Sequence, residues 1–227
     1  MKIFTYIKKS SSRIKSKNFV SLSGKPLWTI LTEELSQIAD FYIDTDSIEV
    51  RDHCLKNYNN VVPYMRGQAF IDMENDPLNK ESPALLMTKN FLNLYVKDDE
   101  EIIVLTHVTS PFLKKETVLE ACKLIQEDRY EFVHSVTSRK DFAWLKGVTN
   151  PINFNPKIVQ RTQDLDEILF SNGAFFIFKK KNFIKYNNRL GKNNFLFKLD
   201  SIQGVEVDYP EDLELAKIIM RGINENY

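Results

Sequence analysis

The sequence has little of what small folds use in place of a large hydrophobic core. Its 227 residues include two cysteines, three histidines and seven glycines. Cys54 and Cys122 are too few for a disulfide framework, and neither lies in a Cys-x-x-Cys pair or a Cys/His cluster. We expect both to be buried apolar side chains in a reducing compartment. The chain is long enough to fold on a hydrophobic core alone.

A surplus of charge and a long apolar run are also missing. The 31 Lys and Arg residues balance the 31 Asp and Glu residues, so the formal net charge is zero. A dedicated nucleic-acid-binding protein needs a cationic surplus to release counterions, which disfavours that class. No apolar run approaches the length of a membrane span, and the first residues lack the pattern of a signal peptide. We therefore expect a soluble, cytoplasmic protein without a nucleic-acid or membrane partner.

The hydrophobic periodicity predicts strands that alternate with helices along the chain. Strands are expected at 3–7, 41–43, 61–65, 101–106, 132–136, 172–178, 195–197 and 205–208. Helices are expected at 27–38, 48–55, 85–95, 115–127 and from Pro210 onward. The alternation predicts an α/β fold, in which a mostly parallel, Rossmann-like sheet carries helices on both faces. A single domain over residues 1–227 is the simplest account.

Two stretches show no clear period. Residues 66–83 are predicted to be a loop. Residues 139–160, which contain Trp144, Pro151 and Pro156, also lack a pattern. Because so long a loop in a compact domain usually has a function, we expect residues 139–160 to form a lid or a dimerisation element.

The first loop is rich in cations and hydroxyl groups. Residues 8–18 follow the first predicted strand and hold five Lys or Arg residues and four serines. Backbone N–H groups and serine hydroxyls can bind phosphate oxygens, while the cations neutralise their charge. A solvated loop is the alternative. Ligands of such sheets bind at the carboxyl ends of the strands, where this loop, Asp46, residues 107–110 and the pair Glu206/Asp208 would meet.

Glu206 and Asp208 are two residues apart on a predicted strand, so their side chains should point to the same side. Paired carboxylates at a strand end suit Mg²⁺, which prefers oxygen ligands and shares its coordination shell with phosphates. The alternative is an acidic start to the last helix, in which Asp212 acts as the cap.

Several short motifs occur together in a fixed order. They are Lys8–Asn18, Leu22–Leu27, Asp44–Ser47, Leu105–Phe112, Arg161–Leu165, Asn172–Ala174, Glu206–Asp208 and Pro210–Leu213. In this order the sequence resembles, nearly end to end, the acylneuraminate cytidylyltransferase family, which includes the CMP-sialic acid synthetases. Those enzymes join CTP to an acidic nine-carbon sugar and release pyrophosphate. The resemblance implies a fold of the nucleotide-diphospho-sugar transferase type, a Mg²⁺ cofactor and a homodimer.

The resemblance also implies roles for individual residues. Nucleotide contacts are expected from Lys8, Ser10, Ser11, Ser12, Arg13, Lys17, Asn18, Asp46 and Arg66. Acceptor contacts are expected from His107, Thr109, Ser110, Arg161, Gln163 and Asn172. Lys17 and Asp208 are expected to be catalytic, and Glu206 and Asp208 to hold Mg²⁺. Plainer alternatives stay open, namely a surface salt bridge for Arg161, a helix cap for Asp46, and a general base or a structural hydrogen bond for His107.

The sequence departs from the family pattern at several site positions. Such departures occur at Lys8, Ser10, Ser12, Lys15, His107, Val108, Leu113 and Glu206. Our prediction is a Mg²⁺-dependent cytidylyltransferase that transfers CMP from CTP to an acidic, nonulosonic (sialic-acid-like) sugar for surface-glycan biosynthesis. One alternative keeps CTP but uses another acceptor, such as a phosphonate or a different keto-acid. The other is a non-catalytic, nucleotide-binding relative.

Overall fold

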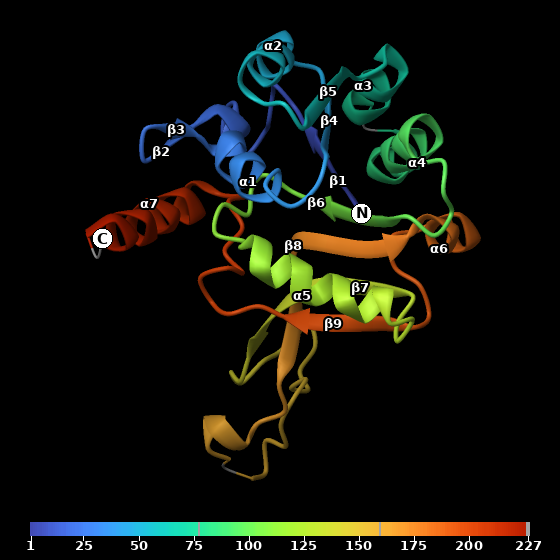
Figure 1. Cartoon of the computed structure of the whole chain (residues 1–227). Helices are drawn as coiled ribbons and strands as arrows, with labels where there is room; N and C mark the ends of the chain where they lie inside the picture. Colours follow the sequence, from blue (N-terminus) through green and yellow to red (C-terminus); the bar gives the residue numbers. More distant parts are fainter. Residues whose placement is uncertain (77, 159, 226–227) are drawn as a thin grey trace.

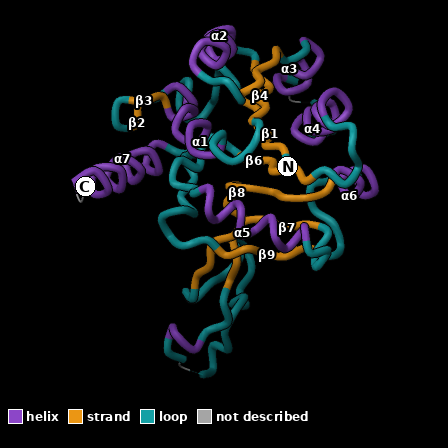
Figure 2. Tube along the Cα trace, in the orientation of Figure 1, coloured by secondary structure: helices purple, strands orange, loops and turns teal. Residues whose placement is uncertain are grey.

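A seven-stranded sheet in the order β5-β4-β1-β6-β8-β7-β9 forms the centre of the computed structural model (Figures 1 and 2). Its strands are β1 (Lys2–Ile7), β4 (Phe41–Thr45), β5 (Val61–Met65), β6 (Ile102–Thr106), β7 (Phe132–Arg139), β8 (Ile168–Lys179) and β9 (Asn194–Lys198). Within this sheet β8 runs opposite to its neighbours β6 and β7, and the other pairs are parallel. The structure describes residues 1–76, 78–158 and 160–225. Residue 77 of the predicted loop, residue 159 of the predicted excursion and the last two residues of the predicted domain lie outside this part.

Helices cover both faces of the sheet (Figure 1). On one face lie α1 (Leu27–Leu35), α2 (Ile48–Asn57) and α5 (Lys115–Gln126), and on the other lie α4 (Pro83–Tyr95) and α6 (Lys180–Tyr186). The last helix, α7 (Pro210–Glu225), packs against the small hairpin of β2 (Ser21–Leu22) and β3 (Lys25–Pro26). Its first residue is Pro210, and two carboxylates in its first turn complement the helix dipole.

Side chains alternate between the two faces along each strand, as the pleat of a strand requires. In β1, Ile3 and Ile7 pack toward α1, α2 and α5, whereas Phe4 packs toward α4 and α6. The predicted α/β fold with helices on both faces of a mostly parallel sheet is therefore confirmed. Cys54 and Cys122 lie in the first of these clusters. Burial raises the pKa of each thiol to about 12, which keeps both protonated and unreactive, as expected.

Two of the predicted elements are wrong. The predicted loop 66–83 contains a helix, α3 (Gln68–Asn75), which has no buried residue and so gives a weak periodic signal. The predicted strand 205–208 is an extended loop without a strand partner. The Val207 N–H donates to the Thr109 carbonyl at 2.8 Å, and the Val207 side chain is fully buried. Glu206 and Asp208 therefore still point away from the side on which Val207 is buried.

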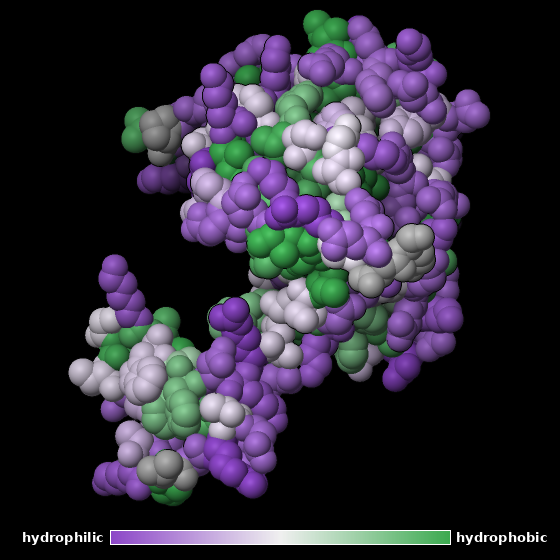
Figure 3. Space-filling view, turned by 90° about the vertical axis from the view of Figure 1, so that its left-hand side faces the viewer, coloured by the Kyte–Doolittle hydropathy of each residue, from purple (hydrophilic) through white to green (hydrophobic). Residues whose placement is uncertain are grey.

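The excursion predicted at 139–160 is part of a longer feature. The end of β7 and the start of β8 continue to pair beyond the sheet, from Val136 opposite Ser171 to Arg139 opposite Ile168. Residues 140–167, which we call the arm, project from the body and are separated from it by a deep notch (Figures 1 and 3). Asn153 holds the arm together by donating to the carbonyls of Asp141 and Asp166 at 2.9 and 3.0 Å.

In the part of the chain that the structure describes, no helix has the length and apolar character needed to cross a membrane.

Candidate active site

The loop between β1 and the 3-10 turn η1 (Lys17–Phe19) is closed by hydrogen bonds within itself. The Asn18 amide donates to the Lys8 carbonyl at 2.9 Å, and the Ser11 hydroxyl accepts from the Lys17 N–H at 2.8 Å while donating to the Ile14 carbonyl. Asp46, which follows β4, accepts from the Lys9 N–H at 2.6 Å. Asn18, Ser11 and Asp46 thus shape the loop, and the side chains of Lys8, Arg13 and Lys17 line the cavity beside it.

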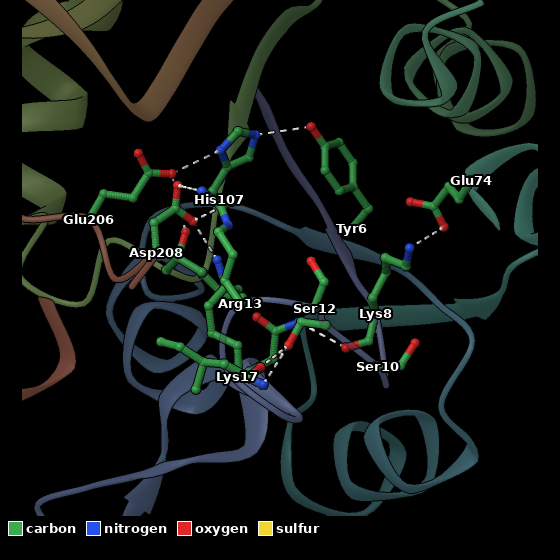
Figure 4. Close-up of a pocket in the computed structure, with 15 residues that line it drawn as sticks. Tyr6, Lys8, Ser10, Ser12, Arg13, Lys17, Glu74, His107, Glu206 and Asp208 are labelled. Carbon is green, nitrogen blue, oxygen red and sulfur yellow. Dashed lines mark hydrogen bonds and ion pairs between the residues drawn. The ribbon is translucent and has the colours of Figure 1, made fainter. Parts of the chain in front are cut away.

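The loop forms one wall of a cavity of about 370 Å³ at the carboxyl ends of β1 and β6 (Figure 4). The cavity is lined by Tyr6, Lys8, Ser10, Ser11, Ser12, Arg13, Ile14, Lys17, Asn18, Glu74, His107, Val108, Thr109, Glu206 and Asp208. The structure therefore brings together eleven of the predicted site residues. Tyr6 and Glu74 were not predicted. Glu74 lies on α3, in the stretch 66–83 that was predicted to be a loop, and recognising this helix would have pointed to Glu74.

Asp208 binds two cations of the loop. The Lys17 ammonium donates to Asp208 Oδ1 at 2.6 Å, and the Arg13 guanidinium binds the same carboxylate through two contacts of 3.0 Å. Arg13 also lies over the Tyr209 ring, 4.9 Å from its centroid. Burial pushes the pKa of Asp208 upward, but Lys17 and Arg13 outweigh it, so the pKa of this carboxyl is below its usual value. Asp208 is therefore ionised at neutral pH.

A second group of polar side chains runs from Glu206, which is drawn next to Asp208, through His107 to Tyr6 in Figure 4. The Tyr6 hydroxyl and His107 Nε2 are hydrogen-bonded at 3.0 Å. His107 Nδ1 lies 3.9 Å from Glu206 Oε1, and the Thr109 hydroxyl donates to the same oxygen at 3.5 Å. Gly173 packs against Glu206 and His107, because a Cβ atom at Gly173 would lie 3.1 Å from Glu206 Oε1 and from His107 Nδ1. The φ of Gly173 is +68°, a conformation that favours glycine.

Arg66 stands behind the cavity rather than in its lining. Its guanidinium binds Asp44 at 2.5 Å and Glu74 at 2.6 Å, and the side chains of Arg66 and Asp44 are fully buried. Burial raises the pKa of Asp44 although Arg66 opposes this. Glu74 lines the cavity and lies 3.7 Å from the Lys8 ammonium. In this arrangement Arg66 reaches the cavity only through Glu74.

The other predicted residues lie outside the cavity lining. Asp46 does not cap α2, because the Ser47 hydroxyl accepts from the Val50 N–H instead. Ser110 is fully buried, and Asn172 accepts from the Ser135 hydroxyl at 2.6 Å.

The last two predicted residues lie on the arm. Arg161 binds Asp164 at 2.7 and 3.2 Å, and the Gln163 carbonyl accepts from Lys140. The salt bridge considered for Arg161 is therefore present within this chain.

Comparison with known proteins identifies the family. The sequence profile described as "Cytidylyltransferase" matches residues 9–220. The chain belongs to the cytidylyltransferase family. It is 27% identical over 218 residues to the N-acylneuraminate cytidylyltransferase A of Danio rerio, covering 91% of this chain and 47% of that protein. It is 23% identical over 226 residues to a pseudaminic acid cytidylyltransferase of Campylobacter jejuni, covering 95% and 94%.

The chain spans about half the length of the N-acylneuraminate cytidylyltransferases that it matches. Among solved structures, it resembles a CMP:2-keto-3-deoxy-manno-octonic acid synthetase complexed with CTP, with a TM-score of 0.64 and 15% identity over 97% of this chain and 98% of that one. A 4-diphosphocytidyl-2C-methyl-D-erythritol synthase from Anaerococcus prevotii gives a TM-score of 0.63 at 12% identity over 96% and 98%. The predicted fold type and family resemblance are both confirmed.

The cavity provides what nucleotidyl transfer demands of a protein. Charge that develops on phosphate oxygens in the transition state is stabilised by cations held in place beforehand. Lys17 and Arg13 are held in this way by Asp208, and Lys8 adds a third cation from the same loop. The chain therefore combines a nucleotidyltransferase fold with a cavity that holds cations at the carboxyl ends of the strands.

Proposed function

We propose that the cavity binds CTP together with an acidic, nonulosonic sugar and transfers CMP to the sugar. The acceptor's hydroxyl oxygen attacks the α-phosphorus of CTP, and the bond from that phosphorus to the oxygen bridging to the β-phosphate breaks. Pyrophosphate leaves with this oxygen, and the hydroxyl proton passes to solvent. The proposal rests on the family of the chain and on one observation in particular: two loop cations converge on Asp208 inside the cavity.

Lys17, Arg13 and Lys8 supply the positive charge that the triphosphate needs. Arg13 presents a planar fork that matches two phosphate oxygens, whereas each ammonium acts as a point charge. When the triphosphate binds, its oxygens take the place of Asp208 as partners of Lys17 and Arg13. Ser10 and Ser12 line the same wall and can donate their hydroxyls to phosphate oxygens.

Glu206 and Asp208 would hold the Mg²⁺ ion. Mg²⁺ is usually bound by one or two carboxylates together with substrate phosphates, rather than by an all-protein cage. The donor set fits this pattern, because no cluster of three or more His, Cys, Asp or Glu side chains among the described residues could hold a metal alone. When bound, the ion would neutralise charge on the phosphates. Exchange of Lys17 and Arg13 onto phosphate would free the oxygens of Asp208.

The exposed side chains of the arm are the reason to propose a homodimer. Trp144 on the arm and Phe170 next to it in β8 are 54% and 48% exposed, and exposed apolar patches mark interaction sites. Arg161 and Gln163, which the sequence predicts to contact the acceptor, lie on the arm and away from the cavity of their own chain. They would reach an acceptor only in the cavity of a second copy.

Dimerisation is tested by Phe170→Asp, which places a charge on the apolar base of the arm. We expect a dimer by sedimentation equilibrium for the unaltered protein and a monomer for the variant. Leu55→Asp is the control, because Leu55 is 66% exposed on α2, outside the arm. A monomeric unaltered protein, or a dimer that survives Phe170→Asp unchanged, would contradict this assignment of the arm.

The activity is tested by measuring pyrophosphate release with Mg²⁺, each of the four NTPs and a panel of acidic sugars that includes N-acetylneuraminate. We expect release only with CTP and an acidic sugar, and its collapse in Asp208→Ala. Glu211→Ala is the matched control, since Glu211 is an exposed carboxylate in the first turn of α7. CTP binding without pyrophosphate release on any sugar would refute the proposed class of acceptor. The absence of CTP binding would refute the proposed nucleotidyl-transfer activity.

A further inference from the structure

Tyr6 lines the cavity at the carboxyl end of β1, and its hydroxyl has two hydrogen-bond partners among the described residues. The first is the guanidinium of Arg189, a group that can only donate. The second is His107 Nε2, at 3.0 Å. Burial raises the pKa of Tyr6, and the charge of Arg189 opposes this rise. The hydroxyl therefore keeps its proton at neutral pH and has this one proton to donate.

These two partners determine which nitrogen of His107 carries the proton. Because the Tyr6 oxygen accepts from Arg189, the Tyr6 proton is left for His107. If Nε2 also carried a proton, the Tyr6 proton would have no acceptor among the described residues, and a donor removed from water without a partner costs free energy. Nε2 is therefore the acceptor, and the proton of the uncharged imidazole lies on Nδ1.

The Nδ1 proton lies next to Glu206 in the cavity. Figure 4 shows the imidazole between Tyr6 and Glu206, with one ring nitrogen toward each. Nδ1 is 3.9 Å from Glu206 Oε1, beyond the range of about 2.7–3.2 Å for an N–H···O hydrogen bond. The side chains of His107 and Glu206 are 21% and 27% exposed, and both line the cavity. A donor and an acceptor thus lie side by side, open to a ligand and too far apart to satisfy each other.

A hydroxyl group matches this pair of atoms. Its oxygen can accept from Nδ1–H of His107, and its proton can be donated to Glu206 Oε1. That oxygen also accepts from the Thr109 hydroxyl at 3.5 Å, and a carboxylate oxygen has lone pairs for both donors. A carboxylate or a phosphate has no proton for Glu206, and its charge would be repelled there. Of the groups that an acidic sugar carries, a hydroxyl is the one that this pair accepts.

We propose that His107 Nδ1–H and Glu206 Oε1 together bind a hydroxyl group of the sugar, and that Tyr6 is the positioning residue that holds His107 in this tautomer. The assignment rests on the proposed function. It uses one oxygen of Glu206, which leaves Oε2 for the proposed Mg²⁺ ion. It also separates the roles open to His107. With Nε2 bonded to Tyr6 and a proton on Nδ1, the imidazole has no lone pair toward the cavity and cannot act as the general base.

Two variants of His107 distinguish a donor from a base. His107→Asn keeps an N–H at the position of Nδ1, because both side chains branch at Cγ, but it has no basic nitrogen. It should leave kcat within about threefold and raise the acceptor KM less than His107→Leu, for which loss of the hydrogen bond predicts a rise of about twofold to tenfold. The KM for CTP should stay within about twofold in both variants, which also shows that they fold. The control is His53→Leu, since His53 is exposed on α2 and outside the cavity lining.

NMR of the protein with isotope-labelled histidine nitrogens detects the tautomer without turnover. At about pH 8, above the ordinary histidine pKa of about 6.5, the His107 signals should be those of an imidazole protonated on Nδ1. Tyr6→Phe should convert them to the signals of a mixture of tautomers, and the acceptor KM should rise with it. Adding N-acetylneuraminate to the CTP-bound protein in EDTA should shift the His107 Nδ1 signal, relative to CTP alone, and leave the His53 signals in place.

Three results would overturn the proposal: a proton on Nε2 of His107 in the unaltered protein, an unshifted Nδ1 signal when the sugar is added, or a fall in kcat of about a hundredfold or more in His107→Asn, the loss expected for a general base. Pyrophosphate release separates this failure from that of the proposed function. If the unaltered protein releases no pyrophosphate with any sugar, the proposed function fails, and the NMR signals still decide the roles of Tyr6 and His107. If it releases pyrophosphate and any of the three results is found, the proposed function stands and this proposal fails.

Discussion

Asp208 should weaken CTP binding in the absence of Mg²⁺, although we propose that turnover requires it. In the free protein this carboxylate binds Lys17 and Arg13, the two cations that we propose for the triphosphate. CTP must break both ion pairs before it can use these cations. Replacing the carboxylate with an amide of the same shape removes this competition. We therefore expect Asp208→Asn to bind CTP more tightly than the unaltered protein when Mg²⁺ is absent.

The size of the effect follows from the exposure of the two ion pairs. Asp208 is 27% exposed, Lys17 is 13% exposed and Arg13 is 46% exposed. Solvent screening reduces pairs of this kind to about 0.5–1 kcal/mol each. Together they amount to about 1–2 kcal/mol, which corresponds to about a fivefold to thirtyfold increase in CTP affinity. The increase should shrink as salt rises, because exposed charges are screened within about 10 Å at 0.1 M.

The assay is isothermal titration of CTP in EDTA at low and at moderate ionic strength. Glu211→Gln removes a nearby charge that touches neither cation, so it controls for a general change of electrostatic potential. With Mg²⁺ present, pyrophosphate release by Asp208→Asn should fall even though CTP binds. Unchanged or weaker Mg²⁺-free binding in Asp208→Asn would refute the view that Asp208 competes with phosphate for Lys17 and Arg13.

Three further predictions concern the framework of the site. Arg66→Met should lower the free energy of unfolding by about 3–5 kcal/mol in urea titrations, because it leaves Asp44 buried and unpaired. Gly173→Ala should lower the free energy of unfolding by about 1–2 kcal/mol, because alanine is strained at a φ of +68°. It should also raise the KM for the acceptor more than that for CTP, because the new methyl group would press on the side chains of Glu206 and His107. Burial lowers the pKa of His134 below its ordinary value of about 6.5. As pH falls through about 6.5, the unfolded chain takes up a proton that folded His134 does not, so stability should fall by up to about 1.4 kcal/mol per pH unit. A His134→Gln variant should show a flatter pH dependence of its melting temperature over this range, and an equal slope would contradict the prediction.

The basic loop and the strands of the sheet were predictable because their signals are local. A β-prone run followed by cations and serines occurs within the first 18 residues, and its chemistry needs no tertiary information. The order of the motifs then placed the remaining loops at the same edge. The direction of β8 gave no local signal, because a buried strand has the same composition whether its neighbours are parallel or antiparallel.

The rest of the site depends on contacts that no local pattern reveals. The sequence indicated that Arg66 belongs to the site, but its pairing with Asp44 and Glu74 is set by the register of β4 and β5 and by α3, a helix without buried residues.

One strand, β8, runs from the base of the arm to the cavity. Its first residues pair with the end of β7 at the base of the arm, and a few positions later Gly173 touches His107 and Glu206. Farther along, Phe176 holds Arg189. The pairing of β7 with β8 changes register between these stretches, since Val136 pairs with Ser171 and His134 with Phe176. A displacement of the arm would therefore reach the cavity through this irregular stretch, which includes the left-handed turn at Gly173.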